Sequence, residues 1–439
     1  MQTGVTAGVT DQMDVRGSDH RMLQRFVSGR VFYGWYIVYA IGFGLMATSG
    51  LAFYNLSVLL NAFVTERGFP VGLASGATAT YFIASGLGGV LAGRLIDRFD
   101  PRPIMITGAC VSAIALGCVG LLRTPLALYG FHVVFGFCYG CCGLVPATTI
   151  VARWFEARRP LALSIATTGL SLGGIVVTPA SAFLIAHWGL SGAAPWLGLA
   201  MVLGVVPATA LVVRASPGAL GLEPDGAVYA DGAPPPPRSI PFALARRSRF
   251  FIGLTAAYIF GLGAQVGAIA HLYRLVNTRD GVETAALAVA LLAAGSLVGR
   301  LSGGWILTKV AARPFALSMF VGQTLTMVVL ALATDRIPLL VGVASFGLTV
   351  GNVLMLQPLL LVNAFGTSEY ARIYSVSQLL TALGVAGGPA LLGLIDEATG
   401  SYTLPYLAAA AGSCVGLVVL ALAHAGPPPA AGAARAACT

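Results

Sequence analysis

Long apolar runs separated by short polar turns make up most of the chain. No charged side chain lies between Arg30 and Glu66, and similar runs follow as far as residue 424. Such runs match the roughly 20 residues that a helix needs to cross the hydrocarbon core of a bilayer. Residues 160–213 hold no charge, and the polar stretch 187–195 divides them into two helices. The pattern predicts twelve membrane-spanning helices: 34–58, 72–94, 103–122, 126–150, two within 160–213, 250–273, 284–308, 314–334, 338–364, 371–395 and 403–424.

A polar segment at residues 215–249 interrupts this series after the sixth helix. It contains the prolines 234–237, several glycines and three arginines near its end, so we expect it to stay outside the membrane. The sequence therefore predicts an all-α membrane protein with twelve transmembrane helices in two six-helix halves. The expected parts are an N-terminal tail at 1–32, a bundle at 33–214, a central loop at 215–249, a bundle at 250–425 and a C-terminal tail at 426–439.

The charges are few and unevenly placed. The chain has 9% charged residues, against about 25% in soluble domains. Its net charge of +9 would suit a nucleic-acid binder, but the distribution favours a membrane protein. If the N-terminus is cytoplasmic, 19 of the 25 lysines and arginines fall in cytoplasmic segments, five in outer loops and one, Arg300, within a helix. This asymmetry predicts that both tails and the central loop are cytoplasmic, with the lipid bilayer and no nucleic acid as partner.

The two halves contain related turns. Residues 93–103 and 304–314 lie 211 positions apart, each after the second helix of its half, which is typical of secondary transporters whose site lies between two repeats. In the first turn, an acidic side chain near a helix end and two arginines could lock one conformation and break in another. The alternative is a cytoplasmic anchor without a switching role. The candidate switch residues are Gly93, Asp97, Arg98 and Arg102.

These turns resemble the loop motif of the major facilitator superfamily. The match is Gly93-x-Leu95-x-Asp97-Arg98-x-x-x-Arg102, and the second copy has Thr308 in place of the acidic residue. The resemblance implies the major facilitator fold.

A narrower resemblance is to bacterial monocarboxylate and oxalate/formate carriers, which implies the bacterial inner membrane. Four features carry it: Tyr33-Gly34-Trp35; Arg153-Trp154-Phe155-x-x-Arg158-Arg159 followed by Ala162 and Gly169; Pro217-Gly-Ala-Leu-Gly-Leu-x-Pro-Asp-Gly226; and Arg300 in the eighth helix.

Arg300 is the most informative residue for function. A charge at a helix centre costs about 2.5–3.5 kcal/mol on insertion scales, and the 16 acidic residues all lie in termini, loops or helix ends. An anionic substrate is the simplest counter-ion, because a guanidinium binds a carboxylate through two parallel hydrogen bonds. Alternatively, Arg300 could extend toward the cytoplasmic surface, roughly 12 Å away.

Two positions differ from the resembling animal carriers. Ser296 lies one turn before Arg300, on the same helix face, where those carriers have an acidic residue. Asn55 aligns with their lysine in the first helix. Both differences argue against the animal-type proton relay, although both residues remain candidates for substrate binding.

Other polar side chains could share the cavity or simply join helices by hydrogen bonds. The remaining substrate-binding candidates are Tyr139, Gln265, Asn352, Tyr374 and Gln378. His132 and His271 could carry a proton near neutral pH, or serve in packing.

The charge count favours a monocarboxylate, because no second cation lies deep in a helix to hold a dianion. We expect a monomeric secondary transporter of lactate-, pyruvate- or hydroxy-acid-like anions, with proton-coupled uptake by alternating access, and exchange as an alternative mode. An efflux carrier of amphipathic drugs and a non-transporting receptor are the other interpretations. We expect no enzyme activity or cofactor, because no nucleotide-binding loop or nucleophilic triad is visible in the sequence. We expect no metal, because Cys138 and Cys141 lack the further ligands of a metal site.

Overall fold

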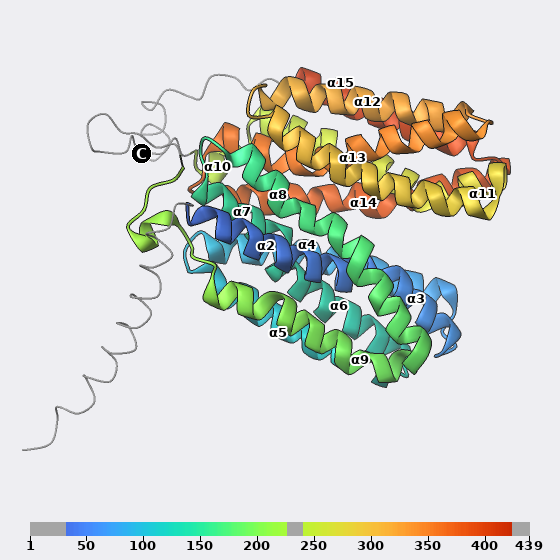
Figure 1. Cartoon of the computed structure of the whole chain (residues 1–439), viewed down its shortest axis with the longest axis horizontal. Coiled ribbons are helices and arrows are strands. Elements are labelled where there is room, and N and C mark those ends of the chain that lie inside the picture. Colours follow the sequence, from blue (N-terminus) through green and yellow to red (C-terminus); the bar gives the residue numbers. More distant parts are fainter. Residues whose placement is uncertain (1–31, 226–239, 424–439) are drawn as a thin grey trace, which may run out of the picture.

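The computed structural model describes residues 32–225 and 240–423. The two expected tails, apart from residue 32, and residues 226–239 of the expected central loop therefore lie outside the described residues. Two bundles of helices lie side by side in Figure 1. The first bundle contains α2 (Gly34–Thr48), α3 (Asn55–Thr65), α4 (Val71–Ile96), α5 (Pro101–Gly117), α6 (Pro125–Cys142), α7 (Leu144–Trp154), α8 (Arg159–Leu172) and α9 (Thr178–Leu211). The second contains α11 (Arg249–Ile306), α12 (Ala312–Leu332), α13 (Arg336–Phe365), α14 (Tyr370–Thr399) and α15 (Thr403–Leu422).

Within the described residues, 11 helical stretches are long and apolar enough to cross a membrane. One of them, residues 159–211, makes two crossings because the chain turns back at Gly189. Gly189 has a φ of 66°, and the helices on its two sides run in opposite directions along α2. Gly281, with a φ of 85°, separates the two arms of α11. Glycine adopts such angles without steric cost. The all-helical fold predicted from the apolar runs is confirmed.

The first crossing differs from its prediction. We expected one helix over residues 34–58, whereas helical structure runs on to Thr65 and includes a π-helical segment, η1 (Ser49–Phe53). A second π-helical segment, η3 (Gly173–Val177), joins α8 to α9. The two segments contact each other. The Oγ of Ser49 donates to the carbonyl of Leu170 over 3.1 Å, and the Oγ1 of Thr178 donates to that of Gly50 over 3.0 Å.

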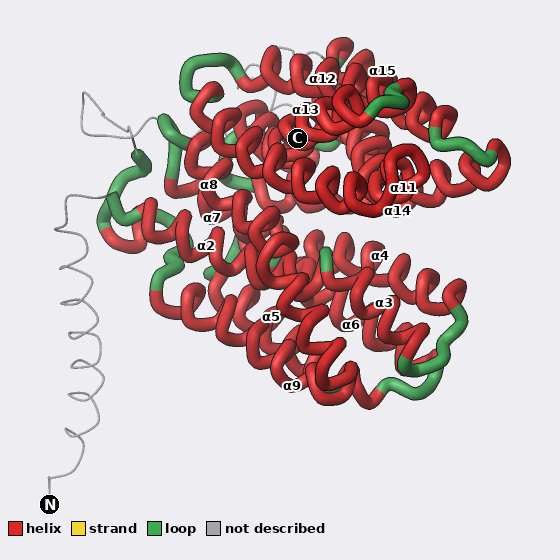
Figure 2. The backbone as a smooth tube through the Cα atoms, turned by 45° about the vertical axis from the view of Figure 1, so that its right-hand side comes forward, coloured by secondary structure: helices red, strands yellow, loops and turns green. Residues whose placement is uncertain are grey.

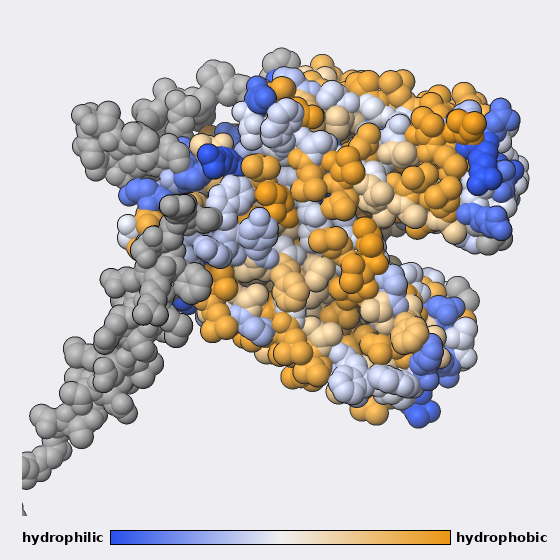
Figure 3. Space-filling model, viewed as in Figure 1, coloured by the Kyte–Doolittle hydropathy of each residue, from blue (hydrophilic) through white to orange (hydrophobic). Residues whose placement is uncertain are grey.

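The bundles converge at one end of the molecule and diverge toward the other. We call the first the linker end; it carries α10 (Phe242–Ala245) and the turn at 97–100 between α4 and α5. The other, the open end, carries the turns at Gly189 and Gly281. Figures 1 and 2 show the separation widening toward the open end, and the space-filling view in Figure 3 is hollowed there between the bundles. Apolar side chains cover much of the surface between the ends in that view, as expected of a surface facing lipid.

Candidate functional site

Arg300 lies where the two bundles meet, on the second arm of α11. Its side chain is only 3% exposed. Nε donates to the carbonyl of Gly351 on α13 over 3.1 Å, and Nη1 donates to the carbonyl of Thr167 on α8. None of the ion pairs found among the described residues includes Arg300. The buried charge is thus held by backbone dipoles from both bundles.

Ser296 and Arg300 face the same helix, α8. The Ser296 Oγ lies 3.4 Å from the Oγ of Ser171, and the Oγ of Ser164 donates to the backbone carbonyl of Arg300. Our prediction that Ser296 and Arg300 share one face of the helix agrees with this geometry. The result is a polar seam between α8 and α11.

Tyr54 was missed by the sequence analysis. It follows η1 directly, and its backbone N–H donates to the carbonyl of Ser49 over 2.9 Å. Its ring lies against Gly174 of η3, where a Cβ would be only 3.2 Å from a ring carbon. Tyr54 is close enough to Arg300 for an electrostatic interaction, and its side chain is 39% exposed. The adjacent Asn55 was the one signal for this position, and no sequence pattern indicated the π-helical turn that presents the ring.

Two further candidates lie in the first bundle. Asn55 is fully buried, and neither its amide nitrogen nor its amide oxygen has a hydrogen-bond partner among the described residues. Tyr139 is partly buried, with its ring 5.6 Å from that of Tyr81, and lies within electrostatic range of Tyr54.

The candidates of the second bundle differ in their surroundings. The Nδ2 of Asn352 donates to the carbonyls of Gly299 and Leu348, over 2.8 and 2.9 Å, so it joins α13 to α11. Tyr374 is fully buried and stacks on Tyr370, with ring centroids 5.7 Å apart. Its hydroxyl, and the side-chain oxygens of Gln265 and Gln378, have no hydrogen-bond partner within the described ranges. No contact of the described structure joins these last three side chains to Arg300.

The two histidines occupy unlike positions. His132 is buried inside the first bundle, where its Nδ1 lies 2.9 Å from the carbonyl of Leu128 and its ring 5.8 Å from that of Phe63. His271, on α11, has its Nε2 3.0 Å from the carbonyl of Pro389 on α14. Its Nδ1 is buried without a hydrogen-bond partner among the described residues.

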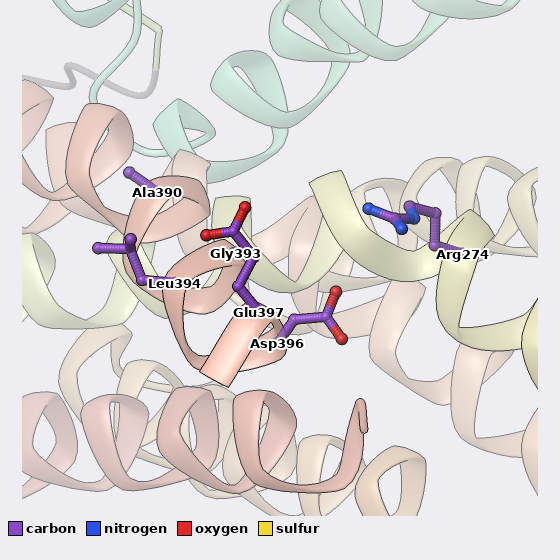
Figure 4. Close-up of a pocket in the computed structure, with 6 residues that line it drawn as sticks. All are labelled: Arg274, Ala390, Gly393, Leu394, Asp396 and Glu397. Atoms are coloured by element: carbon purple, nitrogen blue, oxygen red, sulfur yellow. The ribbon is translucent and has the colours of Figure 1, made fainter. Parts of the chain in front are cut away.

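A pocket at the open end lies beside His271. Its volume is about 480 Å³, and Figure 4 shows Arg274 of α11 together with two carboxylates of α14, Asp396 and Glu397. A Cβ on Gly393, which also lines this pocket, would lie 3.6 Å from the His271 ring. The pocket thus places ionisable groups in the neighbourhood of His271.

At the linker end, Asp97 joins the two bundles. Its carboxylate lies 3.5 Å from Nη2 of Arg153 and accepts the backbone N–H of Arg372, in the first turn of α14, over 3.2 Å. Burial raises the pKa of Asp97 to about 6, although Arg153 and the N–H of Arg372 lower it. The raised pKa shows that desolvation outweighs these two favourable partners.

The other three candidate switch residues lie in different surroundings. Gly93 packs so closely on α14 that a Cβ would lie 2.5 Å from the carbonyl of Ala371. Arg98 is exposed. Arg102 pairs with Asp100 of its own bundle over 2.6 Å, so it does not bridge the two bundles in this conformation.

Comparison with known proteins identifies the family. The model of the Major Facilitator Superfamily matches residues 42–357. The chain belongs to this superfamily. It is similar to mouse monocarboxylate transporter 11, with 26% identity over 393 residues that cover 85% of this chain and 84% of the relative. It is also similar to rat monocarboxylate transporter 4, with 24% identity over 89% of this chain and 83% of the relative.

Solved structures of the superfamily share the fold. The Escherichia coli fucose:proton symporter matches with a TM-score of 0.67 and 16% identity, covering 89% of this chain and 99% of that chain. A proton:xylose symporter matches with a TM-score of 0.69 and 14% identity, covering 89% and 95%. The superfamily resemblance is thus confirmed, and the protein is a multi-pass membrane transporter of this superfamily rather than an enzyme. The two relatives named above are animal proteins, so the bacterial subfamily stays a prediction.

Proposed function

We propose that this superfamily member is a secondary transporter of small organic monocarboxylates, such as pyruvate, lactate or another hydroxy acid, working by alternating access. The observation that carries the proposal is the buried guanidinium of Arg300, which has hydrogen bonds to carbonyls but no carboxylate partner in the described structure. A charge held only by neutral dipoles attracts an anion strongly in a low-dielectric site.

The geometry of Arg300 suits a carboxylate. The hydrogen bonds of its guanidinium found among the described residues use Nε and Nη1. Nη2 remains to donate to a ligand, and a carboxylate that takes both terminal nitrogens would form the bidentate pair that arginine favours. Ser296, Tyr54 and Tyr139 could then hydrogen-bond the second carboxylate oxygen or a neighbouring hydroxyl or keto group. The names of the animal relatives support the same class of substrate.

The charge of the site favours one negative charge on the substrate. Arg300 is the one lysine or arginine that the sequence places near a helix centre. A dianion would bring an uncompensated charge out of water, which is costly in a low-dielectric environment. We therefore infer a monocarboxylate rather than a dicarboxylate.

Proton coupling is the second part of the proposal. Ser296 cannot carry a proton as an acidic residue would, so the proton either travels on the substrate or uses a histidine. Of the two candidates, His271 is the better placed, because it lies beside the open-end pocket that holds Asp396 and Glu397. His132 is enclosed by the aromatic core of the first bundle.

We also propose that the protein is a monomer in a bacterial inner membrane, with the linker end cytoplasmic. The excess of arginine in the segments assigned to that side supports the orientation. In this orientation the described conformation is closed to the cytoplasm and widens toward the outside.

Replacement of Arg300 tests the proposal in proteoliposomes. Arg300→Lys keeps the charge but loses the planar fork, so lactate uptake should fall by about tenfold or more. Arg300→Gln should bind no carboxylate while the protein stays folded, because removal of the charge relieves the cost of its burial. In wild-type protein, unlabelled lactate and pyruvate should compete for uptake better than succinate or oxalate.

Arg279→Gln is the matched control. Arg279 also donates to backbone carbonyls, with three bonds of 2.6–2.8 Å, but it does so at the open end. This variant should lose thermal stability yet keep carboxylate affinity. Normal lactate binding by Arg300→Gln, measured by calorimetry, would remove Arg300 from the site and contradict the proposal.

A further inference from the structure

The same guanidinium that we propose as the carboxylate ligand joins the two bundles. Its Nη1 donates to the carbonyl of Thr167 on α8, in the first bundle, while its Nε donates to Gly351 of its own bundle. The seam around it has two further polar contacts between α8 and α11, from Ser164 to the carbonyl of Arg300 and between the hydroxyls of Ser171 and Ser296. All three contacts lie within two turns of α8.

These contacts close the linker-end side of the interface. Four residues beyond Arg300, Gly304 packs so tightly that a Cβ would meet the side chain of Ser164 and lie 3.5 Å from the Cα of Leu161. Helices α8 and α11 therefore have to separate here before the linker end can open.

We propose that Arg300 is also a latch: its bond to the Thr167 carbonyl holds α8 against α11, and an arriving carboxylate withdraws Nη1 from that bond. This inference rests on the proposed function, because it gives the substrate-binding group a second task. It assigns a role in substrate-dependent opening to Thr167, Ser164 and Ser171, which the sequence analysis did not single out.

The arrangement of the two carbonyl partners supports this mechanism. Gly351 belongs to the same bundle as Arg300, so the Nε bond can persist while the bundles move apart. The Nη1 bond spans the bundles, so it cannot. A carboxylate that binds end-on, through Nη1 and Nη2, replaces a neutral carbonyl by an anion as the partner of Nη1, and charge-assisted pairs are roughly twice as strong as neutral ones.

Such a switch requires that the substrate bind the two states with different affinities. A ligand shifts an equilibrium only by its difference in affinity between the two states. With the latch closed, the carboxylate competes with the Thr167 carbonyl for Nη1. With the latch open it has no competitor, so the substrate favours the open-latch state.

The experiment measures separation of the bundles directly. Spin labels at positions 157 and 310, which are exposed at the linker-end termini of the two bundles, report the distance distribution by pulsed electron resonance. The background is a cysteine-free chain in nanodiscs. In wild-type protein without ligand, the short distance should dominate, and sodium lactate should increase the long-distance population. Lactamide, a neutral isostere, should leave the distribution unchanged.

Variants separate the latch from substrate binding. Arg300→Gln without ligand should raise the ratio of long to short distances by about tenfold, as expected for loss of a charged hydrogen bond. Ser164→Ala removes one neutral interhelical bond and should raise it about threefold. The matched control is Ser302→Ala, because the Ser302 hydroxyl bonds only to carbonyls of its own helix in the described structure. Its distribution should equal that of wild type.

The two proposals fail in different ways. If Arg300→Gln binds no carboxylate, and both Arg300→Gln and Ser164→Ala keep the wild-type distances, the latch is wrong and the proposed function stands. If Arg300→Gln binds lactate normally while its distances shift, the latch stands and the proposed substrate site is wrong. A lactate-insensitive distribution in active wild-type protein would also overturn the latch.

Discussion

Several arginines of this chain donate to backbone carbonyls, and the partners of Arg67, Arg279 and Arg300 distinguish a stabilising role from a functional one. Arg279 binds the carbonyls of Leu330, Ala331 and Ala333, at the C-terminal end of α12. Arg67, 212 positions earlier, binds the carbonyl of Gly120 in the short 3-10 helix η2 (Val119–Leu121), which follows α5. Terminal carbonyls have no partner within their own helix, so an arginine there completes a cap.

Arg300 has different partners. Thr167 and Gly351 lie inside α8 and α13, where carbonyls already accept bonds from their own helices. A guanidinium with only such shared acceptors stays weakly compensated. This distinction supports a ligand-binding role for Arg300 and a stabilising role for Arg67 and Arg279.

At the residue scale, pH should affect closure of the linker end through Asp97. The pKa of Asp97 is raised to about 6 by burial, with Arg153 and the N–H of Arg372 as partners and Glu369 as a repelling charge. In water its pKa would be about 3.9. The closed arrangement therefore binds a proton more tightly than an opened, hydrated one. The extra stability that the proton on Asp97 gives the closed arrangement is fully present below about pH 4 and is lost as the pH rises through 6.

Acidification from pH 7.5 to 5 should consequently increase the short-distance population at positions 157 and 310, and Asp97→Asn should remove this dependence. Asp100→Asn, three residues on, changes a carboxylate that is paired with Arg102 within one bundle; its pH profile should match wild type. An unaltered profile in Asp97→Asn would show that another group titrates.

For single residues, the sequence predicts the depth in the membrane and the helix face, but not the groups that surround the side chain. Arg300 and Ser296 were placed correctly relative to each other because the helical period fixes their angle. Tyr54 was missed. The amide nitrogen of Asn352 joins α13 to α11, and its role in substrate binding stays a prediction. Which carbonyl or ring adjoins a side chain depends on neighbouring helices, and one chain's pattern does not contain that information.

At the scale of elements, small residues and π-helical turns set the contacts between helices. The segments η1 and η3 lie against each other, and one extra residue per turn rotates the following helix, so that Tyr54 comes near Arg300. Single π-turns in helices are frequent at functional sites. They were not predictable here, because their stabilisation comes from the facing helix rather than from local propensity.

Replacement of Gly93 tests the contact between α4 and α14. A Cβ there would lie 2.5 Å from the carbonyl of Ala371 and 2.6 Å from the Oγ of Ser375. Gly93→Ala should force the helices apart, weaken closure of the linker end and reduce uptake by about tenfold, a cost within the range for overpacking. Distances between labels 157 and 310 and initial uptake rates would measure both effects.

Gly387→Ala is the control for this substitution. Gly387 lies within α14, and a Cβ there would meet no atom within 4 Å. Since alanine favours a helix over glycine, this variant should keep or slightly gain thermal stability and transport normally. Equal behaviour of the two variants would mean that close packing at Gly93 has no part in closure.

At the scale of the whole molecule, the arrangement in two bundles that the sequence predicts is present in the structure. The twelve apolar segments, the repeat of related turns and the polar segment at 215–249 predicted a fold that the model and its structural relatives share. The direction in which the bundles open was beyond the sequence, since a hydropathy pattern is the same in every conformation. The described state is hollowed at the open end.

The orientation of this state in the membrane is the last prediction, and the proposed direction of access depends on it. Asp335 is an exposed residue at the open end, before α13, and Ala157 is exposed at the linker end, before α8. With 19 of 25 positive residues assigned to the linker-end side, the membrane potential and the insertion machinery should keep that side in the cytoplasm. In intact cells, an impermeant maleimide should label a cysteine at 335 and spare one at 157, and permeabilisation should expose both. The native cysteines have to be replaced first, because Cys118 is itself exposed. Labelling of 157 alone would place the linker end outside, and the same structure would then be a state open to the cytoplasm, from which substrate leaves rather than enters.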